Sequence, residues 1–102
     1  MDSTPETRTE IRVVNKKRDA YDVYIGRGSI WGNPFIIGKH GDRAEVIRKY
    51  EEYLANSPVL LARLPELLGK RLACFCAPLA CHGHVLKRWA ERLFNEAQEA
   101  TR

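Results

Sequence analysis

The sequence predicts a small single α/β domain in which helices pack on a few-stranded, mostly parallel sheet, in the order β-β-α-α-β-α. Three short apolar runs, at residues 11–15, 21–25 and 70–75, contain the β-branched and aromatic residues typical of strands. A long helical segment separates the second run from the third, and such a crossover favours parallel pairing. The 102 residues, of which 44% are hydrophobic, suit one domain with a modest core.

The first half of the chain predicts two strands followed by a loop. Residues 11–15 form the first strand, a charged turn follows, and residues 21–25 form the second strand, which ends at Gly26. Five glycines occur between residues 26 and 41. This content is typical of a shaped loop, in which we expect only a short extended piece at residues 35–37.

The middle of the chain predicts two helices. Asp42 is a good N-cap for a helix over residues 43–55. The apolar stripe of this helix consists of Val46, Ile47, Tyr50 and Leu54. Ser57, which a proline follows, caps a second helix over residues 59–68, which Pro65 can interrupt, and Gly69 ends it.

The end of the chain predicts one further helix, which begins at His82 or Gly83 and runs to about residue 97. Its buried stripe consists of Val85, Leu86, Trp89, Leu93 and Phe94. The polar residues 1–10 predict a disordered leader and residues 99–102 a tail. The folded domain is therefore expected over residues 11–98.

Charge and cysteine content restrict the partners and the location. A net charge of +4 predicts attraction to phosphates, which suits a small phosphorylated ligand. Nucleic-acid binding has weaker support, because the sequence contains no basic stripe with interleaved aromatic residues. No apolar stretch approaches the ~20 residues of a membrane span, and residues 1–10 do not resemble a signal peptide. Three closely spaced cysteines fit a reducing compartment, so we expect a cytoplasmic protein.

All three cysteines and two of the three histidines lie within residues 74–84, where a predicted strand leads into the last helix. Ligand sites of α/β proteins tend to lie at such junctions. Gly83 would let an anion approach the positively polarised N-terminus of the helix. His82 and His84 are then candidate proton donors or acceptors, and Cys81 is a candidate nucleophile with a lowered pKa.

Two other interpretations of this segment are open. Three cysteines and one histidine form a typical ligand set of a structural zinc site, and here these would be Cys74, Cys76, Cys81 and His84. The spacing of these residues differs from the usual knuckle, which has two residues between its cysteines. Alternatively, Cys74 and Cys76 are core residues of a buried strand, since free cysteine is among the most buried residue types.

The loop after the second predicted strand is a candidate for the opposite wall of a site. Gly26, Arg27, Gly28 and Ser29 offer backbone N–H groups, a guanidinium and a hydroxyl, which together suit an anion-binding nest. The segment is not a P-loop, because no Gly-Lys-Ser/Thr ending is present.

Trp31 and Asn33 lie further along the same loop. We expect Trp31 to stack on a base and Asn33 to meet a base edge or a sugar. Core packing is the alternative for Trp31, as it is for other large aromatic residues. A turn role next to Pro34 is the alternative for Asn33.

Four motifs carry a family resemblance: YIGRGS at residues 24–29, WGNPF at 31–35, CFCAP at 74–78 and CHG at 81–83. With these motifs the chain resembles DUF4326, a family of uncharacterised small domains of bacteria and phages. The resemblance covers roughly residues 11–93 and implies no established activity. One departure concerns His84, because the family usually has an aspartate after Cys-His-Gly.

Together these features predict a site for a nucleotide or a nucleotide-derived phosphate between residues 26–34 and the N-terminus of the last helix. Arg27, Ser29 and Gly83 would hold the phosphate. If the domain is an enzyme, hydrolysis or group transfer on this ligand is the expected class, without a cofactor. The alternative is a zinc-stabilised, non-enzymatic module that binds nucleic acid or a protein partner. No oligomeric state is predicted.

Overall fold

The computed structural model describes residues 10–76 and 79–100. Its elements are β1 (Arg12–Asn15), β2 (Val23–Tyr24), α1 (Arg43–Ala55), α2 (Pro58–Arg63), the 3-10 helix η2 (Leu64–Leu67), β3 (Arg71–Cys74) and α3 (His82–Ala100). The predicted order β-β-α-α-β-α is confirmed, with η2 added. Most of the predicted leader, residues 77–78 of the CFCAP motif, and residues 101–102 of the predicted tail lie outside the described residues.

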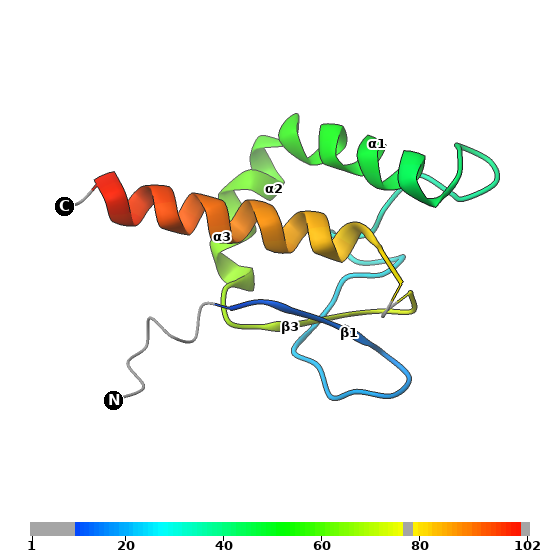
Figure 1. Cartoon of the computed structure of the whole chain (residues 1–102), viewed down its shortest axis with the longest axis horizontal. Coiled ribbons are helices and arrows are strands. Elements are labelled where there is room, and N and C mark those ends of the chain that lie inside the picture. Colours follow the sequence, from blue (N-terminus) through cyan, green and yellow to red (C-terminus); the bar gives the residue numbers. More distant parts are fainter. Residues whose placement is uncertain (1–9, 77–78, 101–102) are drawn as a thin grey trace.

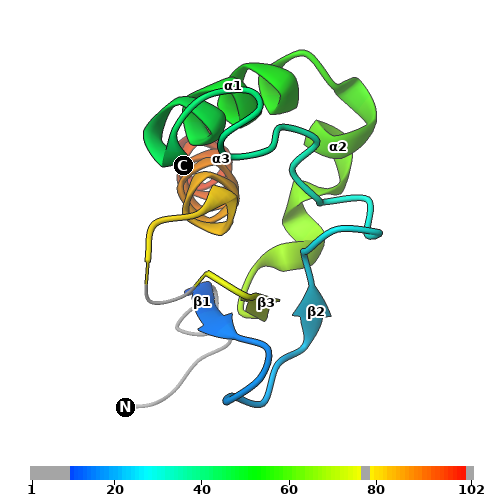
Figure 2. The ribbon, with the colours of Figure 1, turned by 90° about the vertical axis from the view of Figure 1, so that its right-hand side faces the viewer.

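The three strands form one parallel sheet in the order β1-β3-β2, so that β3 lies in the centre. Helices α1, α2 and α3 all lie on one side of this sheet (Figure 1). The view along the strands shows the same two layers, with the helices on one side and the three strands in a row on the other (Figure 2). The domain is therefore a two-layer α/β fold, as the sequence predicts.

Two rows of side chains cross the sheet and point to opposite faces, because successive strand residues alternate. The first row is Val13, Leu72 and Val23, and the second row is Val14, Ala73 and Tyr24. The first row belongs to the hydrophobic core or packs against it. The second row therefore faces away from the helices.

The strands are shorter than the sequence predicts. β2 is confined to two residues, and β3 ends at Cys74, so that Phe75 lies beyond the strand and is exposed. The parallel hydrogen bonds continue past β2, since the Ile25 N–H donates to the Ala73 carbonyl at 2.9 Å. Ile25 is fully buried, so the chain enters the glycine-rich loop from inside the core.

The segment before α1 turns where we expect an extended piece at residues 35–37. The His40 N–H donates to the Ile36 carbonyl at 2.8 Å, and the Ile36 N–H donates to His40 Nδ1 at 2.9 Å. These bonds satisfy the backbone within the turn, which removes the need for a neighbouring strand. Asp42 then caps α1 as predicted, in a reciprocal capping box with Glu45.

The second helix, predicted over residues 59–68, is divided into α2 and η2. Ser57 caps α2 as predicted, because its hydroxyl oxygen accepts from the Leu60 N–H. Pro65 lies in η2 and has no N–H, so a regular α-helical ladder cannot continue through it. Gly69 adopts a φ of +75° and ends the segment, as predicted.

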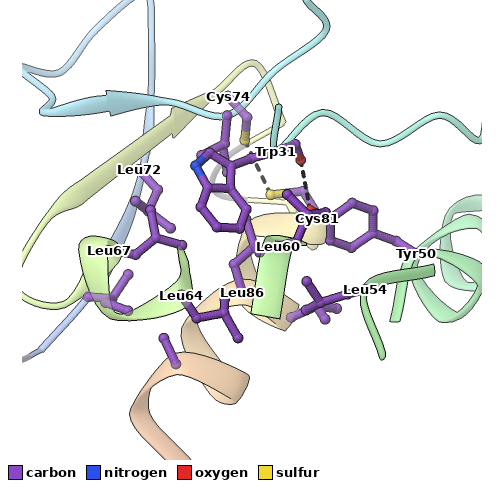
Figure 3. Packing of buried hydrophobic residues seen from close by; sticks show 14 residues of the cluster. Trp31, Tyr50, Leu54, Leu60, Leu64, Leu67, Leu72, Cys74, Cys81 and Leu86 are labelled. Atoms are coloured by element: carbon purple, nitrogen blue, oxygen red, sulfur yellow. Dashed lines mark hydrogen bonds between the residues drawn. The ribbon is translucent and has the colours of Figure 1, made fainter. Parts of the chain in front are cut away.

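The hydrophobic core lies between the sheet and the helices, and it contains residues from every layer (Figure 3). Leu72 from β3 and Leu86 from α3 are both fully buried. Trp31, from the glycine-rich loop, is also buried there, next to Tyr50 of α1. The Tyr50 hydroxyl donates to the Trp31 carbonyl at 2.8 Å, so this loop is tied to the helical layer.

Helix α3 buries less of its predicted stripe than we expect. Val85 and Leu86 are fully buried, Trp89 and Phe94 are half-buried, and Leu93 is 37% exposed. The reason is that α3 extends past the sheet, where only one side of the helix has a neighbour (Figure 1). Among the described helices, none combines the length and the apolar character that a membrane crossing requires.

Candidate functional site

A pocket of about 470 Å³ lies where β2 and β3 end, between the glycine-rich loop, the start of α1 and the start of α3. This is the carboxyl edge of a parallel sheet, where α/β folds place their ligands. Its polar lining residues are Arg27, Asn33, Arg43 and His82. Its other lining residues include Tyr24, Gly26, Phe35, Ile36, Ile37, Phe75 and the three cysteines. The structure thus brings the two predicted walls together.

Two arginines give the pocket a positive charge. Arg27 comes from the loop, and Arg43 is the first residue of α1, where its Nη1 donates to the Ala80 carbonyl at 3.0 Å. Among the described residues that line the pocket, none has an acidic side chain. Two guanidinium groups without a neighbouring carboxylate favour an anionic ligand.

Arg43 is not predicted from the sequence as a site residue. A signal is nevertheless present, because a cation in the first turn of a helix opposes the helix dipole. Such a placement calls for a compensating contact, which here is the bond from Arg43 to the segment before α3. A cation directly after an N-cap such as Asp42 is therefore a feature that could have identified this residue.

The apolar part of the pocket is largely aromatic. Tyr24 and Phe75 meet edge to face, with ring centroids 6.3 Å apart, and Phe35 lies on another part of the lining. Aromatic side chains of this kind stack on planar ligands. Phe35 belongs to the WGNPF motif, whereas Tyr24 and Phe75 reach the pocket because β2 and β3 end at its edge.

Residues 26–29 form a tight turn in which the polar groups of Ser29 form hydrogen bonds within the turn. The Ser29 hydroxyl donates to the Gly26 carbonyl at 2.8 Å, and the Ser29 N–H reaches the same oxygen. Gly28 has a φ of +97°, which only glycine adopts without strain. Neither Gly28 nor Ser29 lines the pocket, so their predicted contact with phosphate has no support from their positions.

Gly26 lines the pocket, and its lack of a side chain is required there. A Cβ at this position would lie 2.4 Å from the Tyr24 hydroxyl oxygen. The same hydroxyl donates to the Arg27 carbonyl at 3.2 Å. The Tyr24 ring therefore lies across the glycine and fixes the start of the loop that carries Arg27.

Trp31 and Asn33 take the alternative roles, core packing for Trp31 and a turn for Asn33. Trp31 is 4% exposed and does not line the pocket, so it packs in the core. Asn33 lines the pocket, but its Nδ2 donates to the Val46 carbonyl at 3.2 Å, and its Oδ1 accepts from the Phe35 N–H at 2.9 Å. The polar atoms of the Asn33 amide thus tie the loop to α1, although the side chain also lines the pocket.

His82 is the buried histidine of the pocket, with 8% of its surface exposed. Its Nε2 lies 2.7 Å from the Ile25 carbonyl, so Nε2 carries the proton and donates. The ring meets Tyr50 edge to face. Burial lowers the pKa of His82 from its ordinary 6.5, and the bond to Ile25 offsets only part of this effect. His82 is therefore neutral at pH 7.

Cys81 is buried, and its sulfur atom contacts two partners. Its Sγ lies 3.2 Å from Cys74 Sγ (Figure 3) and accepts from the Gly83 N–H at 3.3 Å. The hydrogen bond with Cys74, followed by burial, raises the pKa of the Cys81 thiol. This direction corrects the expected lowering, because the neighbouring thiol and the desolvation outweigh the helix N-terminus. The environment favours a protonated thiol, whereas nucleophilic cysteines react as thiolates.

Gly83 and His84 lie apart from the pocket lining. A Cβ on Gly83 would lie 2.8 Å from Ile25 Cδ1 and 3.1 Å from Val13 Cγ1, so this glycine lets α3 pack closely on the sheet. His84 is exposed, and its Nδ1 accepts from the Cys81 N–H at 3.2 Å. The predicted phosphate contact of Gly83 and the predicted proton transfer by His84 have no support from these positions.

Two of the four residues of the zinc alternative, Cys74 and Cys81, lie together in the structure. Cys74 and Cys81 are adjacent, but His84 uses its Nδ1 on the Cys81 backbone. Within residues 10–76 and 79–100, no three His, Cys, Asp or Glu side chains form a group that could hold a metal ion. The alternative stays a prediction, which elemental analysis tests.

Comparison with known proteins identifies the family. Residues 11–92 match the family described as "Domain of unknown function (DUF4326)". The chain belongs to the DUF4326 family. The chain is similar to the "Uncharacterized 12.4 kDa protein in nrdA-td intergenic region" of Enterobacteria phage T4, to which it is 37% identical over 90 residues. That alignment covers 83% of this chain and 82% of the phage protein. No solved structure matches.

Proposed function

We propose that this DUF4326 domain is a cytoplasmic protein that binds a nucleotide or a nucleotide-derived phosphate in the pocket between the glycine-rich loop and the start of α3. The observation that carries the proposal is a pair of arginines, Arg27 and Arg43, on a pocket that has aromatic walls and no acidic side chain among its described lining residues. Its volume of about 470 Å³ falls in the range of small-molecule sites.

The phosphate would lie at the two guanidinium groups. Within the described part of the chain, no ion pair joins an acidic side chain to Arg27 or Arg43. Their charges are thus not neutralised inside the protein. Arginine binds phosphate oxygens in a bidentate manner, with charge-assisted hydrogen bonds that are about twice as strong as neutral ones.

The base would lie against the aromatic wall. Tyr24, Phe35 and Phe75 provide ring surfaces around the pocket, and Ile36 and Ile37 add aliphatic surface. Stacking on such rings accepts any base, so this wall supports a nucleotide without selecting which one.

A reaction on the bound ligand would be hydrolysis or group transfer, with His82 as the acid or base. His82 is the predicted catalytic histidine that lines the pocket, and its neutral imidazole has an Nδ1 lone pair opposite the bonded Nε2. Release of inorganic phosphate from nucleoside triphosphates, compared between the wild type and His82→Gln, tests this extension.

Thermal melting with a panel of nucleotides tests the binding. At a ligand concentration about 100 times its Kd, binding stabilises the folded state by about 2.7 kcal/mol, which corresponds to a Tm increase on the order of 10 °C. We expect Arg27→Ala and Arg43→Ala each to remove most of this increase. Each variant is compared with its own melt without ligand, because Arg43 also bonds to Ala80.

Arg48→Ala is the matched control. Arg48 lies on α1, is exposed, pairs with Glu52 and does not line the pocket. This variant loses the same charge and should keep the full increase in Tm. Binding that survives in both pocket variants, or that falls equally in Arg48→Ala, would overturn the proposal.

A further inference from the structure

The face of the sheet opposite the helices carries aromatic and basic side chains that come from three separate segments. Lys16 and Lys17 follow β1. Tyr21 precedes β2, Tyr24 is the last residue of β2, and Phe75 follows β3. We call these five residues the aromatic-lysine surface. The sequence shows no basic stripe with interleaved aromatic residues, because the parallel sheet is what places these segments side by side.

The geometry of this surface is compact. The Lys16 ammonium lies 5.7 to 5.9 Å from the ring centroids of Tyr21, Tyr24 and Phe75. Lys17 lies 5.9 Å from the Phe75 ring. Two of the rings are open to solvent, since Tyr21 is 40% and Phe75 is 53% exposed.

No described helix covers this side of the sheet (Figure 2). Tyr24 belongs to the row that points away from the helices, and Phe75 continues the alternation of β3 on the same face. The exposed rings of Tyr21 and Phe75 contribute little to the hydrophobic core, which lies between the sheet and the helices. Their exposure next to two lysines therefore calls for a ligand.

We infer that the aromatic-lysine surface binds single-stranded nucleic acid, at a site that shares Tyr24 and Phe75 with the pocket but does not include the pocket arginines. Exposed bases stack on aromatic rings, and lysines neutralise the phosphates that link them. A duplex would bind less well, because its bases are stacked on one another and cannot reach the rings.

The acidic residues near this surface are already engaged. Asp22 pairs with Arg71 at 3.1 Å, and Asp19 accepts from the Asn15 N–H at 2.9 Å. Lys16 and Lys17 form no ion pair with an acidic side chain in the described residues. The charge that faces a ligand here is consequently positive, which complements a phosphate backbone and not a cationic or neutral partner.

Fluorescence anisotropy with a labelled oligothymidylate of about 12 nucleotides, within the range of known single-strand sites, tests the inference. We expect Tyr21→Ala to weaken binding by about 5-fold to 140-fold, as loss of one stacked base would. Lys16→Ala/Lys17→Ala should weaken binding and reduce the slope of log K against log salt by about 1.4. Tyr21, Lys16 and Lys17 do not line the pocket, so their effects report on this surface alone.

Two controls separate specific stacking from general attraction. Lys39→Ala/Arg48→Ala removes the same charge from exposed positions elsewhere and should leave the affinity unchanged. A poly-glutamate peptide should not compete with the oligonucleotide. Circular dichroism confirms that each variant folds.

The outcomes are distinct from those for the pocket. Arg43→Ala should retain oligonucleotide binding even where it loses nucleotide binding. Absence of oligonucleotide binding at about 50 mM salt, where such binding is strongest, would overturn the inference. So would equal binding of a duplex, competition by poly-glutamate, or full affinity in Tyr21→Ala.

Discussion

The sulfur atoms of Cys74 and Cys81 lie 3.2 Å apart across the junction between β3 and α3 (Figure 3). Both residues are 3% exposed, and both belong to the hydrophobic core. The contact joins the end of the central strand to the start of the longest helix. The cysteines that first suggest a metal or catalytic site thus also serve the packing of the fold.

This burial predicts different reactivities for the three thiols. Cys76 is half-buried and lines the pocket, whereas Cys74 and Cys81 are buried and the pKa of Cys81 is raised. Reaction with a chromogenic disulfide at pH 7 should therefore show one fast thiol and two slow ones. Cys76→Ser should remove the fast phase, and Cys81→Ser should retain it. A fast phase that disappears with Cys81→Ser would contradict the structure.

The neutral state of His82 predicts a dependence of stability on pH. Because its folded pKa lies below the ordinary 6.5, the unfolded chain takes up a proton first as the pH falls below 6.5. The stability from neutral His82 is complete above this value and is lost between it and the folded pKa. Urea unfolding at pH 5 to 7.5 should show a smaller loss in His82→Gln.

The close packing of Gly83 predicts that Gly83→Ala destabilises the protein. The added Cβ would lie 2.8 Å from Ile25 Cδ1, and overpacking of this kind costs about 1–3 kcal/mol. Alanine favours a helix more than glycine by about 1 kcal/mol, so the measured loss is the difference between the two effects. Asn95→Ala, at an exposed position of α3, shows the effect of helix propensity alone. Equal stabilisation in both variants would refute the packing role.

The hydrogen bond from Tyr50 to Trp31 predicts a cost for removing one hydroxyl. Tyr50→Phe would leave the Trp31 carbonyl without this donor in a buried place, which costs about 1–3 kcal/mol. Chemical denaturation measures this loss. Tyr53→Phe, on the same helix but 41% exposed, should change stability by less than about 0.5 kcal/mol. A similar effect of both changes would show that the buried bond is not responsible.

The arrangement of the Cys and His side chains predicts that the fold does not depend on zinc. Elemental analysis of the purified protein should give far less than one zinc per chain, and a chelator should leave the Tm unchanged. Near-stoichiometric zinc together with unfolding on chelation would instead favour the zinc-stabilised alternative. Binding to nucleic acid is measured before and after chelation, so that the two alternatives are not confused.

Features that depend on neighbouring residues are predicted from the sequence correctly. The cap of α1 at Asp42, the cap of α2 at Ser57 and the end of η2 at Gly69 all agree with the structure. Capping depends on a side chain and backbone groups three residues away, so a short stretch of sequence suffices to specify it. Strand ends are less well predicted, because Phe75 has the composition of a strand but no pairing partner.

The roles within the candidate site are predicted less well. Arg27 and His82 line the pocket, as expected from their motifs, whereas Ser29 and His84 do not. Ser29 has a local alternative, the Gly26 carbonyl, and the helical direction of α3 turns His84 outward. Whether Ser29 and His84 face the pocket depends on the orientation of their side chains, which composition and spacing do not specify.

By itself, the sequence determined the order of the elements, their caps and the family to which the chain belongs, because these depend on local patterns and on shared motifs. Only the tertiary structure decided which charges and rings meet. Arg43 reaches the pocket because α1 begins beside the segment that precedes α3. Lys16 meets Phe75 because β1 and β3 pair in parallel, and Cys81 keeps its proton because Cys74 lies against it. Each of these contacts joins residues that are distant along the chain or on separate elements, and folding brings them together.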